Sequence, residues 1–201
     1  MIQIFDIPNG FDVSVEVEEL LLRLPQWRLK KAQSYRQDID RFLCAKSFLM
    51  LETMLRENFG LRRCPEFSYE SHGKPVFREY PRIFFNISHC HRGIACAVMD
   101  KPVGIDIEEI QFDKDLGKVI LDKDEYGSVS NAEKPDVEFT KFWTRKESFL
   151  KLTGEGLRDN MKDVLSGVNE VSFTSGINLS VGYIYSTAIW KTCLPDTVSS
   201  I

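Results

Sequence analysis

The chain has 201 residues, of which 43% are hydrophobic and 28% are charged, values typical of a globular protein with one large domain or two small ones. Its net charge of −4 and isoelectric point near 5.5 argue against a general nucleic-acid binder. No apolar run reaches the roughly 18 residues that a membrane-spanning helix needs. The first residues also lack the basic and apolar regions of a signal peptide. We therefore expect a cytoplasmic protein that binds neither nucleic acid nor membrane.

The five cysteines form an odd set without a Cys-x-x-Cys pair, which predicts free buried thiols rather than a disulfide framework. His89, Cys90 and His91 do not predict a zinc site. In a strand Cys90 points away from the two histidines, and no second pair of ligands follows in the sequence.

The first half of the chain is predicted to alternate between strands and helices. The predicted elements are a strand within residues 1–9, a helix over 15–24, a basic segment over 28–36, a core helix over 39–59, and strand-like runs over 65–69, 74–77, 82–89 and 93–99. Arg41 lies in the first turn of the core helix, where the helix dipole disfavours a cation, so it is either an ordinary surface arginine or the ligand of an anion. Gly73, Lys74 and Pro75 form a turn that lets a ligand approach the backbone closely, although an ordinary turn uses the same residues.

The most informative stretch is residues 101–110, in which apolar residues alternate with Asp106 and Glu108. In a strand with one buried face the two acidic side chains project together, with their Cα atoms roughly 7 Å apart. At an effective dielectric near 20 their repulsion is about 3 kcal/mol, so a cation is expected nearby unless the pair lies on a solvated face. With the runs over 82–89 and 93–99, this strand is predicted to form an antiparallel meander.

A third carboxylate lies on a helix predicted over residues 136–153. Lys146 falls in the middle of the apolar stripe of this helix, Glu147 lies on its flank, and Lys151 follows Glu147 by one turn. An ordinary helical Glu-Lys pair, with Lys146 reaching past the aromatic residues to water, would explain this pattern. Together with the acidic strand, however, three carboxylates and two lysines suit a hard cation such as Mg²⁺ and a polyphosphate.

The remaining segments of the second half carry little chemical information. They are predicted to be a modest helix over 112–126, a polar surface loop over 127–135 that faces a partner, and strands over 164–166, 171–174, 179–185 and 188–193.

Three motifs, F-F-N-I-S-H (84–89), V-G-I-D-I-E (103–108) and F-W-T-R-K-E-S-F-L-K (142–151), follow G-K-P (73–75) in an order and spacing that resembles the Sfp-type 4'-phosphopantetheinyl transferases. The resemblance implies an α+β fold with a pseudo-twofold duplication, in which two similar halves each combine an antiparallel sheet with packed helices. Residues 1–100 would form the half that binds the nucleotide of coenzyme A, and residues 101–201 the half with the metal and catalytic residues. The implied reaction transfers 4'-phosphopantetheine from coenzyme A to a serine of an apo acyl or peptidyl carrier protein and releases 3',5'-ADP. Mg²⁺, or alternatively Mn²⁺, would bind the pyrophosphate.

The family's functional residues are carried over by position. The implied metal ligands are Asp106, Glu108 and Glu147. The implied pyrophosphate contacts are Lys146 and Lys151, of which Lys151 also assists the leaving group. The adenine nucleotide would contact Gly73, Lys74, Pro75 and Ser88, and its 3'-phosphate would contact Arg41 and His89. Arg28 and Lys31 loosely fit the basic residues that the family places before the core helix.

Charge then suggests roles in the reaction. Glu147, directly or through a metal-bound water, is the first candidate for the base that takes the serine proton, and Glu108 is the second. The basic residues near the cleft and the predicted loop over 127–135 would dock an acidic carrier protein, of fatty-acid, polyketide or nonribosomal-peptide type. Two halves in one chain favour a monomer.

Two other functions are consistent with parts of the pattern. Another Mg²⁺-dependent phosphoryl-transfer or nuclease-like enzyme would use the same acidic strand and helix, but the negative net charge argues against a nuclease. A non-catalytic binder of coenzyme A and carrier protein would keep the fold, but the presence of all three carboxylates and both lysines argues against it.

Overall fold

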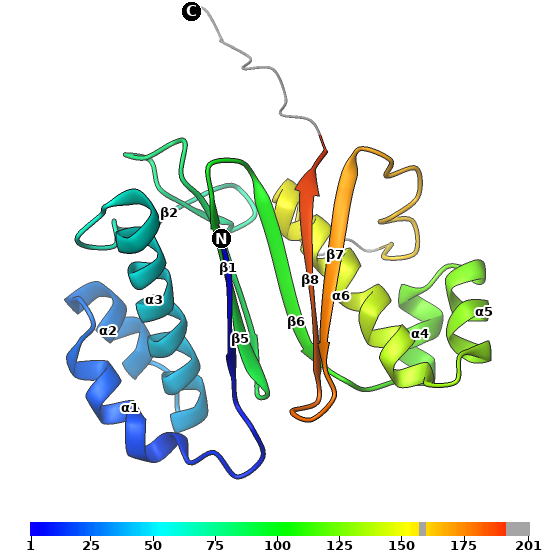
Figure 1. Ribbon diagram of the computed structural model, residues 1–201, viewed down its shortest axis with the longest axis horizontal. Coiled ribbons are helices and arrows are strands. Elements are labelled where there is room, and N and C mark those ends of the chain that lie inside the picture. The colour runs from blue at the N-terminus through cyan, green and yellow to red at the C-terminus, as the bar shows by residue number, and fades with distance from the viewer. Residues whose placement is uncertain (157–159, 192–201) are drawn as a thin grey trace, which may run out of the picture.

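The computed structural model describes residues 1–156 and 160–191. Its elements are β1 (Ile2–Asp6), α1 (Val13–Leu22), α2 (Gln26–Gln33), α3 (Asp38–Phe59), β2 (Ser68–Tyr69), β3 (Pro75–Val76), β4 (Phe84–Cys90), β5 (Gly93–Met99), β6 (Val103–Glu109), α4 (Lys114–Ile120), α5 (Lys123–Asn131), α6 (Pro135–Thr153), β7 (Val171–Asn178) and β8 (Tyr183–Trp190). Figure 1 shows the helices on two outer sides and the strands between them. Within the described ranges, no helix combines the length and the apolar character needed to cross a membrane.

Two antiparallel three-stranded sheets form the centre of the molecule, with the strand orders β1-β5-β4 and β6-β8-β7. Ile87 of β4 lies opposite Cys96 of β5, and Asp106 of β6 lies opposite Ser186 of β8. β2 and β3 form a separate short hairpin. The prediction of an α+β fold with antiparallel sheets and packed helices is therefore confirmed at this level.

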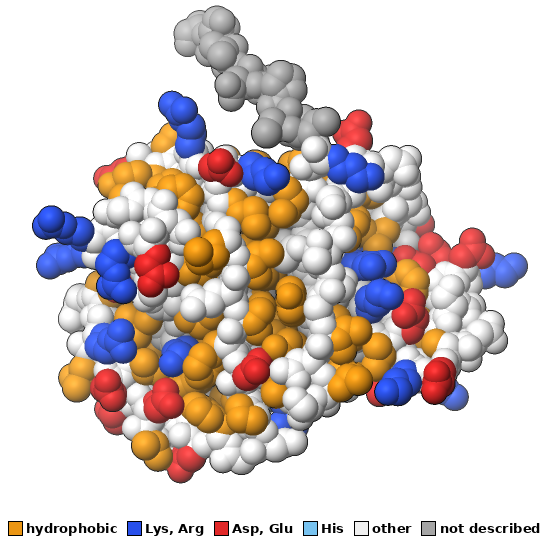
Figure 2. All heavy atoms as spheres, viewed as in Figure 1, with side chains coloured by type: hydrophobic (Ala, Val, Ile, Leu, Met, Phe, Trp, Pro, Cys, Tyr) orange, Lys and Arg blue, Asp and Glu red, His pale blue; other side chains and the backbone are white. Residues whose placement is uncertain are grey.

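The two sheets pack against each other, and helices cover their outer faces. α3 contacts β5, and α6 contacts β6 and β8, so that four layers follow one another across Figure 1. The sheets approach each other closely at Gly93 of β5, where an added Cβ atom would lie 3.0 Å from Cδ1 of Ile107 on β6. In Figure 2 hydrophobic side chains gather over the strands in the middle of the visible face, with charged side chains around them. The buried members of the cluster between the sheets are Ala95, Ala97, Val103, Ile105, Ile107 and Tyr183.

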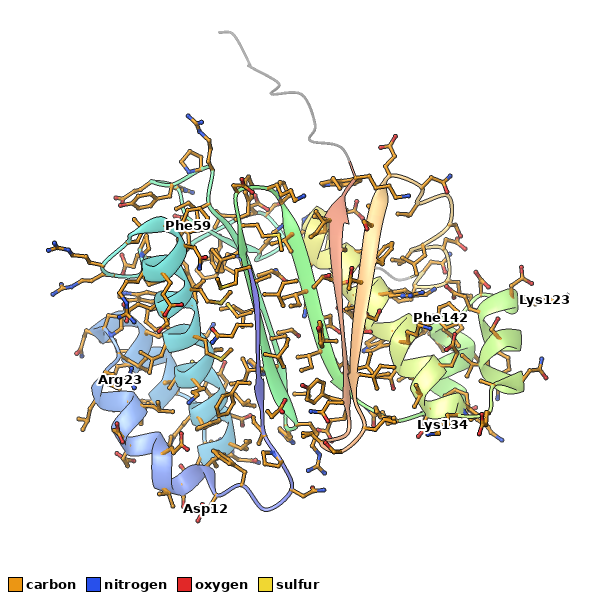
Figure 3. The ribbon with its side chains drawn as sticks, viewed as in Figure 1. Asp12, Arg23, Phe59, Lys123, Lys134 and Phe142 are labelled. Carbon is orange, nitrogen blue, oxygen red and sulfur yellow. The ribbon has the colours of Figure 1, made fainter. Side chains whose placement is uncertain are left out.

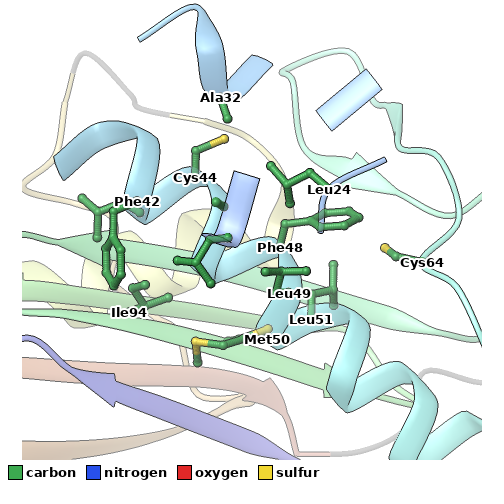
Figure 4. Packing of buried hydrophobic residues seen from close by; sticks show 14 of the residues in the cluster. Leu24, Ala32, Phe42, Cys44, Phe48, Leu49, Met50, Leu51, Cys64 and Ile94 are labelled. Carbon is green, nitrogen blue, oxygen red and sulfur yellow. The ribbon is translucent and has the colours of Figure 1, made fainter. Parts of the chain in front are cut away.

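The core of the first half is organised by α3, as the apolar spacing of residues 39–59 predicted. Phe42 and Phe48 are fully buried in it, and Figure 4 shows Phe42 close to Ile94 of β5 and Cys44 close to Ala32 of α2. The four described cysteines are free, as expected, and Cys193 lies outside the described residues.

Caps fix where several helices begin. The side chain of Asp12 accepts a hydrogen bond from the Ser14 backbone N–H at the start of α1. Asp122 and Glu125 form a capping box at the start of α5, and α6 begins at Pro135. Figure 3 labels Asp12, together with Lys123 and Lys134, where these three helices start.

Several sequence-based expectations are wrong in detail. The basic segment before α3 contains the helix α2, which has too few apolar residues to show a clear periodicity. Residues 127–131 are not a loop but the end of α5, because the capping box and the buried Val129 hold this short helix in place. Residues 164–166 form turns rather than a strand.

The strand pairing also differs from the expected meander. β6 forms no ladder with β5 and instead pairs with β8, so that the acidic strand belongs to the second sheet. β8 continues through residues 186–187, which separate the strands predicted over 179–185 and 188–193, and a turn occupies residues 179–182. The predicted strand over 188–193 extends beyond the described residues.

Candidate active site

An open cleft of about 540 Å³ is lined by residues from both halves of the chain, including most of the predicted site residues. It is lined from the first half by α2, β4 and the turn before β3, and from the second half by β6 and α6. A second pocket of about 260 Å³ adjoins it and shares Gly73, Pro75, Glu147 and Lys151. The predicted site residues that line the main cleft are Arg28, Lys31, Gly73, Pro75, Ser88, His89, Asp106, Glu108, Glu147 and Lys151.

The local sequence explains how β6 and α6 come close enough to share a site. β6 carries Gly104 at the point where it crosses α6, and an added Cβ atom there would lie within 1.9 Å of the Ser148 carbonyl oxygen. Only glycine permits this separation without displacing one of the two elements. The strand therefore presents Asp106 directly to the helix turn that carries Glu147 and Lys151.

Asp106 is 1% exposed and is held by a network from both halves. Its Oδ1 atom accepts hydrogen bonds from Ser88 Oγ at 2.8 Å and from Lys151 Nζ at 2.5 Å, and Lys151 also donates to Ser88 Oγ at 2.8 Å. The lysine thus supplies the positive charge that a buried carboxylate requires. The other oxygen, Oδ2, is buried and has no hydrogen-bond partner among the described residues.

Glu108 and Glu147 are half-buried beside this network. Burial, followed by the negative charge of Asp106, raises the pKa of Glu108 to about 7, while a hydrogen bond from Trp143 acts in the opposite direction. Burial and the Asp106 charge also raise the pKa of Glu147, and Lys151 opposes them. Oε1 of Glu147 is a second buried oxygen without a partner within the described ranges.

These oxygens fit a hard cation by their chemistry. Buried carboxylate oxygens are normally hydrogen-bonded, so the two unpartnered ones are open acceptors. A bound cation would offset the burial and the mutual repulsion that raise the pKa values of Glu108 and Glu147. All-oxygen donor sets are those that Mg²⁺ prefers. In the described part of the chain no three acidic, histidine or cysteine side chains already stand in the arrangement of a metal site, so closure around an ion would require side-chain movement.

Lys146 does not join the site, and the prediction that it contacts the pyrophosphate is wrong. Its side chain is fully buried and points away from the cleft, where its Nζ atom lies 2.7 Å from Oε2 of Glu125. It also donates to the backbone carbonyls of Ile120, Met161 and Lys162. With four acceptors and no exposed surface, this ammonium group cannot reach a ligand in the cleft.

The basic residues of the first half that were predicted to bind coenzyme A differ in their surroundings. Arg28 is buried, lies over the rings of Phe48 and Phe67, and donates to the Cys44 carbonyl, whereas Lys31 is exposed at the cleft. Arg41 is engaged locally, since it donates to Asp38 and to the backbone of the preceding loop.

The remaining predicted contacts lie along the turn before β3 and the end of β4. Lys74 lines the second pocket and donates to the Leu152 carbonyl at 2.9 Å, and burial lowers its pKa. His89 lines the main cleft. Desolvation by the protein around it, followed by the positive charge of Lys151, lowers its pKa.

Sequence reasoning missed several residues that shape the cleft. Trp143 was assigned to the apolar stripe of its helix, but it lines the cleft and hydrogen-bonds Glu108. One indication of this role was present in the sequence, because Trp143 carries a hydrogen-bond donor and lies three residues before Lys146. Phe67 and Tyr69 also line the cleft, and nothing in the sequence indicated it.

Comparisons with known proteins agree with the chemistry of this cleft. A family model described as the 4'-phosphopantetheinyl transferase superfamily matches residues 102–193. The 4'-phosphopantetheinyl transferase psf-1 of Bacillus pumilus is 38% identical over 107 residues, which cover 52% of this chain and 46% of that protein. A 4'-phosphopantetheinyl transferase of Bacillus subtilis is 35% identical over 128 residues, covering 61% of this chain and 56% of the relative.

A third relative matches over a longer stretch. The 4'-phosphopantetheinyl transferase gsp of Aneurinibacillus migulanus is 31% identical over 164 residues, covering 75% of this chain and 64% of that protein. In these matches the chain spans between about half and two thirds of the length of the curated relatives.

Proposed function

Because a model of the 4'-phosphopantetheinyl transferase superfamily matches residues 102–193, we propose that the chain is a member of that family and transfers 4'-phosphopantetheine from coenzyme A to a serine hydroxyl of an apo acyl or peptidyl carrier protein. The observation that carries the proposal is the meeting of Asp106, Glu108 and Glu147 with Lys151 in one cleft. Three acidic groups with one lysine suit a site for a cation and a diphosphate.

We further propose that the chain is a duplication with halves at residues 1–100 and 101–201. In support, each half has a three-stranded antiparallel sheet in which the first strand of the half pairs with its last, and the last pairs with the one before it. Each half also places its longest helix between its first strand and its final hairpin. We also propose that the protein is a monomer that acts in the cytoplasm, and two such halves in one chain are consistent with a monomer.

Mg²⁺, or Mn²⁺ in its place, would be held by the carboxylates of Asp106, Glu108 and Glu147. When bound, the ion would neutralise the charge of the pyrophosphate and of the departing nucleotide. Support comes from the two buried, unpartnered oxygens on Asp106 and Glu147, which are open to a cation even while Lys151 occupies the other oxygen of Asp106.

Coenzyme A would lie across the two adjoining pockets. We propose that the turn formed by Gly73, Lys74 and Pro75, with Ser88, contacts the adenine nucleotide, since these residues border one or both pockets. The 3'-phosphate would be held from the first half. The residues proposed for it are Arg41 and His89, and Arg28 and Lys31 are proposed as further basic residues of the coenzyme A site.

The reaction requires one group that accepts the serine proton and one group that stabilises the negative charge on the leaving oxygen. Glu147, directly or through a water molecule, is proposed to take the proton of the carrier serine, with Glu108 as the second candidate. The serine oxygen then attacks the β-phosphorus of coenzyme A, and the bond between that phosphorus and the bridging oxygen breaks. Lys151, which lines the cleft, is proposed to stabilise the negative charge that develops on the bridging oxygen as 3',5'-ADP departs.

An apo carrier-protein assay tests the proposal. The protein is incubated with coenzyme A, Mg²⁺ and a panel of apo carrier proteins, and transfer is read as a gain of phosphopantetheine by mass spectrometry. D106A and K151M should both lose transfer while keeping the thermal unfolding profile of a folded protein. Binding of coenzyme A without modification of any carrier would instead identify a non-catalytic binder.

A further inference from the structure

A buried ion pair behind the cleft holds the helix that carries two of the proposed site residues. Lys146 of α6 and Glu125 of α5 form a 2.7 Å ion pair between side chains that are 0% and 10% exposed. Oε2 of Glu125 also accepts the Asp122 N–H that closes the capping box of α5. The pair therefore connects the start of one helix to the middle of another.

The same ammonium group donates hydrogen bonds to two more segments of the chain. Lys146 Nζ donates to the Ile120 carbonyl at the end of α4 at 3.0 Å, and to the Met161 and Lys162 carbonyls at 2.9 Å and 3.1 Å. One atom on α6 is thus fixed by α4, α5 and the segment that leads toward β7. Four acceptors at distances of 2.7–3.1 Å define both the position and the rotation of α6 at this residue.

Stability alone does not account for this arrangement. A buried ion pair carries a desolvation cost that often equals its attraction, and apolar side chains of similar volume frequently stabilise a protein as well or better. The neighbours of Lys146 on the helix are apolar and packed, including Phe149 and Leu150 in the core of the second half. Burial energy therefore gives no reason for a charged group at this position, whereas its four contacts do give α6 a defined placement.

What the pair fixes is the side of α6 that faces the cleft. Glu147 follows Lys146 directly, and Lys151 lies little more than one turn further along the helix. At an outer radius of about 5–6 Å, a rotation of roughly 10° moves a side-chain atom by about 1 Å. A displacement of that size is enough to cost about a hundredfold in rate at a catalytic site.

We propose that Lys146 is a positioning residue, whose buried contact with Glu125 sets the rotation of α6 so that Glu147 and Lys151 point into the cleft. The inference rests on the proposed function where it predicts a loss of kcat for transfer. Its second measurement, the affinity for Mn²⁺ with coenzyme A, does not require transfer.

The test compares two double variants on the same helix. E125Q/K146M removes both charges of the buried pair but keeps an acceptor for the capping box. E138Q/K141M removes the partly exposed pair Lys141–Glu138 near the start of α6 and serves as the matched control, since these side chains are 33% and 30% exposed. K146M alone is also made, because it leaves Glu125 buried without its partner and is expected to unfold more readily than the pair variant.

Each folded variant is measured for kcat and KM of transfer, and for the dissociation constant of Mn²⁺ with coenzyme A by electron paramagnetic resonance. E125Q/K146M should keep a cooperative unfolding transition yet lose at least tenfold in kcat with the carrier KM within twofold. Its Mn²⁺ dissociation constant should rise at least tenfold, and E138Q/K141M should match the wild type in both measurements.

Three results would overturn the inference. The first is a folded E125Q/K146M protein with kcat and Mn²⁺ affinity within twofold of the wild type, and the second is an equal loss in the control. If the wild type modifies no carrier, the proposed function fails, and Mn²⁺ binding alone decides the inference. A tenfold weaker Mn²⁺ affinity in E125Q/K146M would then support the inference. An unchanged Mn²⁺ affinity is the third result that would overturn it.

Discussion

The phenolic hydroxyl of Tyr183 on β8 donates a hydrogen bond to Oδ1 of Asp6 on β1 across 2.6 Å. Asn178 of β7 donates to the other oxygen of the same carboxylate at 3.3 Å. Nearby, Arg92 of the first half lies 3.7 Å from Glu109 of the second. Polar contacts thus join the halves at the end of β1.

Tyr183 gives a prediction for stability and for pH. Burial, and then the hydrogen bond to Asp6, raises the pKa of Tyr183 to about 12 from an ordinary 10.0. The neutral phenol is therefore favoured in the folded state, so its stabilisation is complete below pH 10 and is lost as the pH rises through about 12. Y183F should lower the free energy of unfolding by about 1 kcal/mol at pH 8, measured by urea denaturation.

The pH arm of this prediction is measured by absorbance. Subtracting the phenolate titration of Y183F from that of the wild type should show one tyrosine with a midpoint near 12. A midpoint near 10 would show that the contact with Asp6 does not form in solution.

Divalent cations should stabilise the folded protein without any substrate. The unpartnered oxygens of Asp106 and Glu147 are open acceptors, so a bound ion gains contacts that the unfolded chain does not offer. At a Mg²⁺ concentration a hundredfold above the dissociation constant, stabilisation should reach about 2.7 kcal/mol. That corresponds to a rise of roughly 5 to 10 °C in Tm, measured by differential scanning calorimetry against a sample with chelator.

The variant D106N should lose most of that rise in Tm. D115N is the matched control, because Asp115 is an exposed carboxylate on α4 that pairs with Lys118 away from the cleft. If both variants respond to Mg²⁺ as the wild type does, the ion binds elsewhere on the protein.

Gly104 should be the glycine of the second half that is least tolerant of alanine. Its added Cβ atom would meet the Ser148 carbonyl at 1.9 Å and the Leu152 nitrogen at 2.5 Å, both of which are backbone atoms. G104A should lower the free energy of unfolding by about 3 kcal/mol, measured by denaturant unfolding. It should also reduce transfer, because β6 and α6 are forced apart.

Gly127 of α5 offers the opposite case. An added Cβ atom at this helical position has nothing within 4 Å. G127A should therefore stabilise the protein by roughly 0.5 to 1 kcal/mol through helix propensity. Equal effects of the two substitutions would contradict the close packing of β6 on α6.

Exposed basic residues near the cleft should affect carrier-protein binding more than turnover. Lys31 and Arg36 are exposed, whereas Arg28 of the same basic segment is buried. R36E should raise the KM for an acidic carrier protein several-fold, more strongly at low salt, and leave kcat nearly unchanged, because Arg36 is outside the residues proposed to bind coenzyme A. An unchanged KM at low salt would move the carrier-docking surface away from this basic segment.

The parts of the site that follow from local patterns could be predicted from the sequence. The alternation in β6 and the apolar stripe of α6 are set by backbone geometry within one element, so both elements were recognisable. The polar end of β4 was recognisable for the same reason. The topology was not, because the choice of β8 rather than β5 as the partner of β6 depends on contacts more than 70 residues apart in sequence.

Lys146 shows most clearly where sequence reasoning ends. Its position in the middle of an apolar stripe was noticed, and the expectation was that it would reach outward to water or phosphate. The structure instead gives it Glu125 and three backbone carbonyls, a set of acceptors that comes together only through tertiary packing. The loop predicted over 127–135 was wrong for residues 127–131, because the capping box of α5 was overlooked.

The small side chains along β5 have a consequence for how this protein can change over generations. Gly93, Ala95 and Ala97 set how near the two sheets stand, and the cleft is built from residues on both sides of that seam. An added carbon at position 93 would lie 3.0 Å from Cδ1 of Ile107 and 3.1 Å from the Phe5 carbonyl oxygen, so one of these neighbours would have to shift. Packing at the seam should therefore restrict substitutions at residues that do not themselves line the cleft.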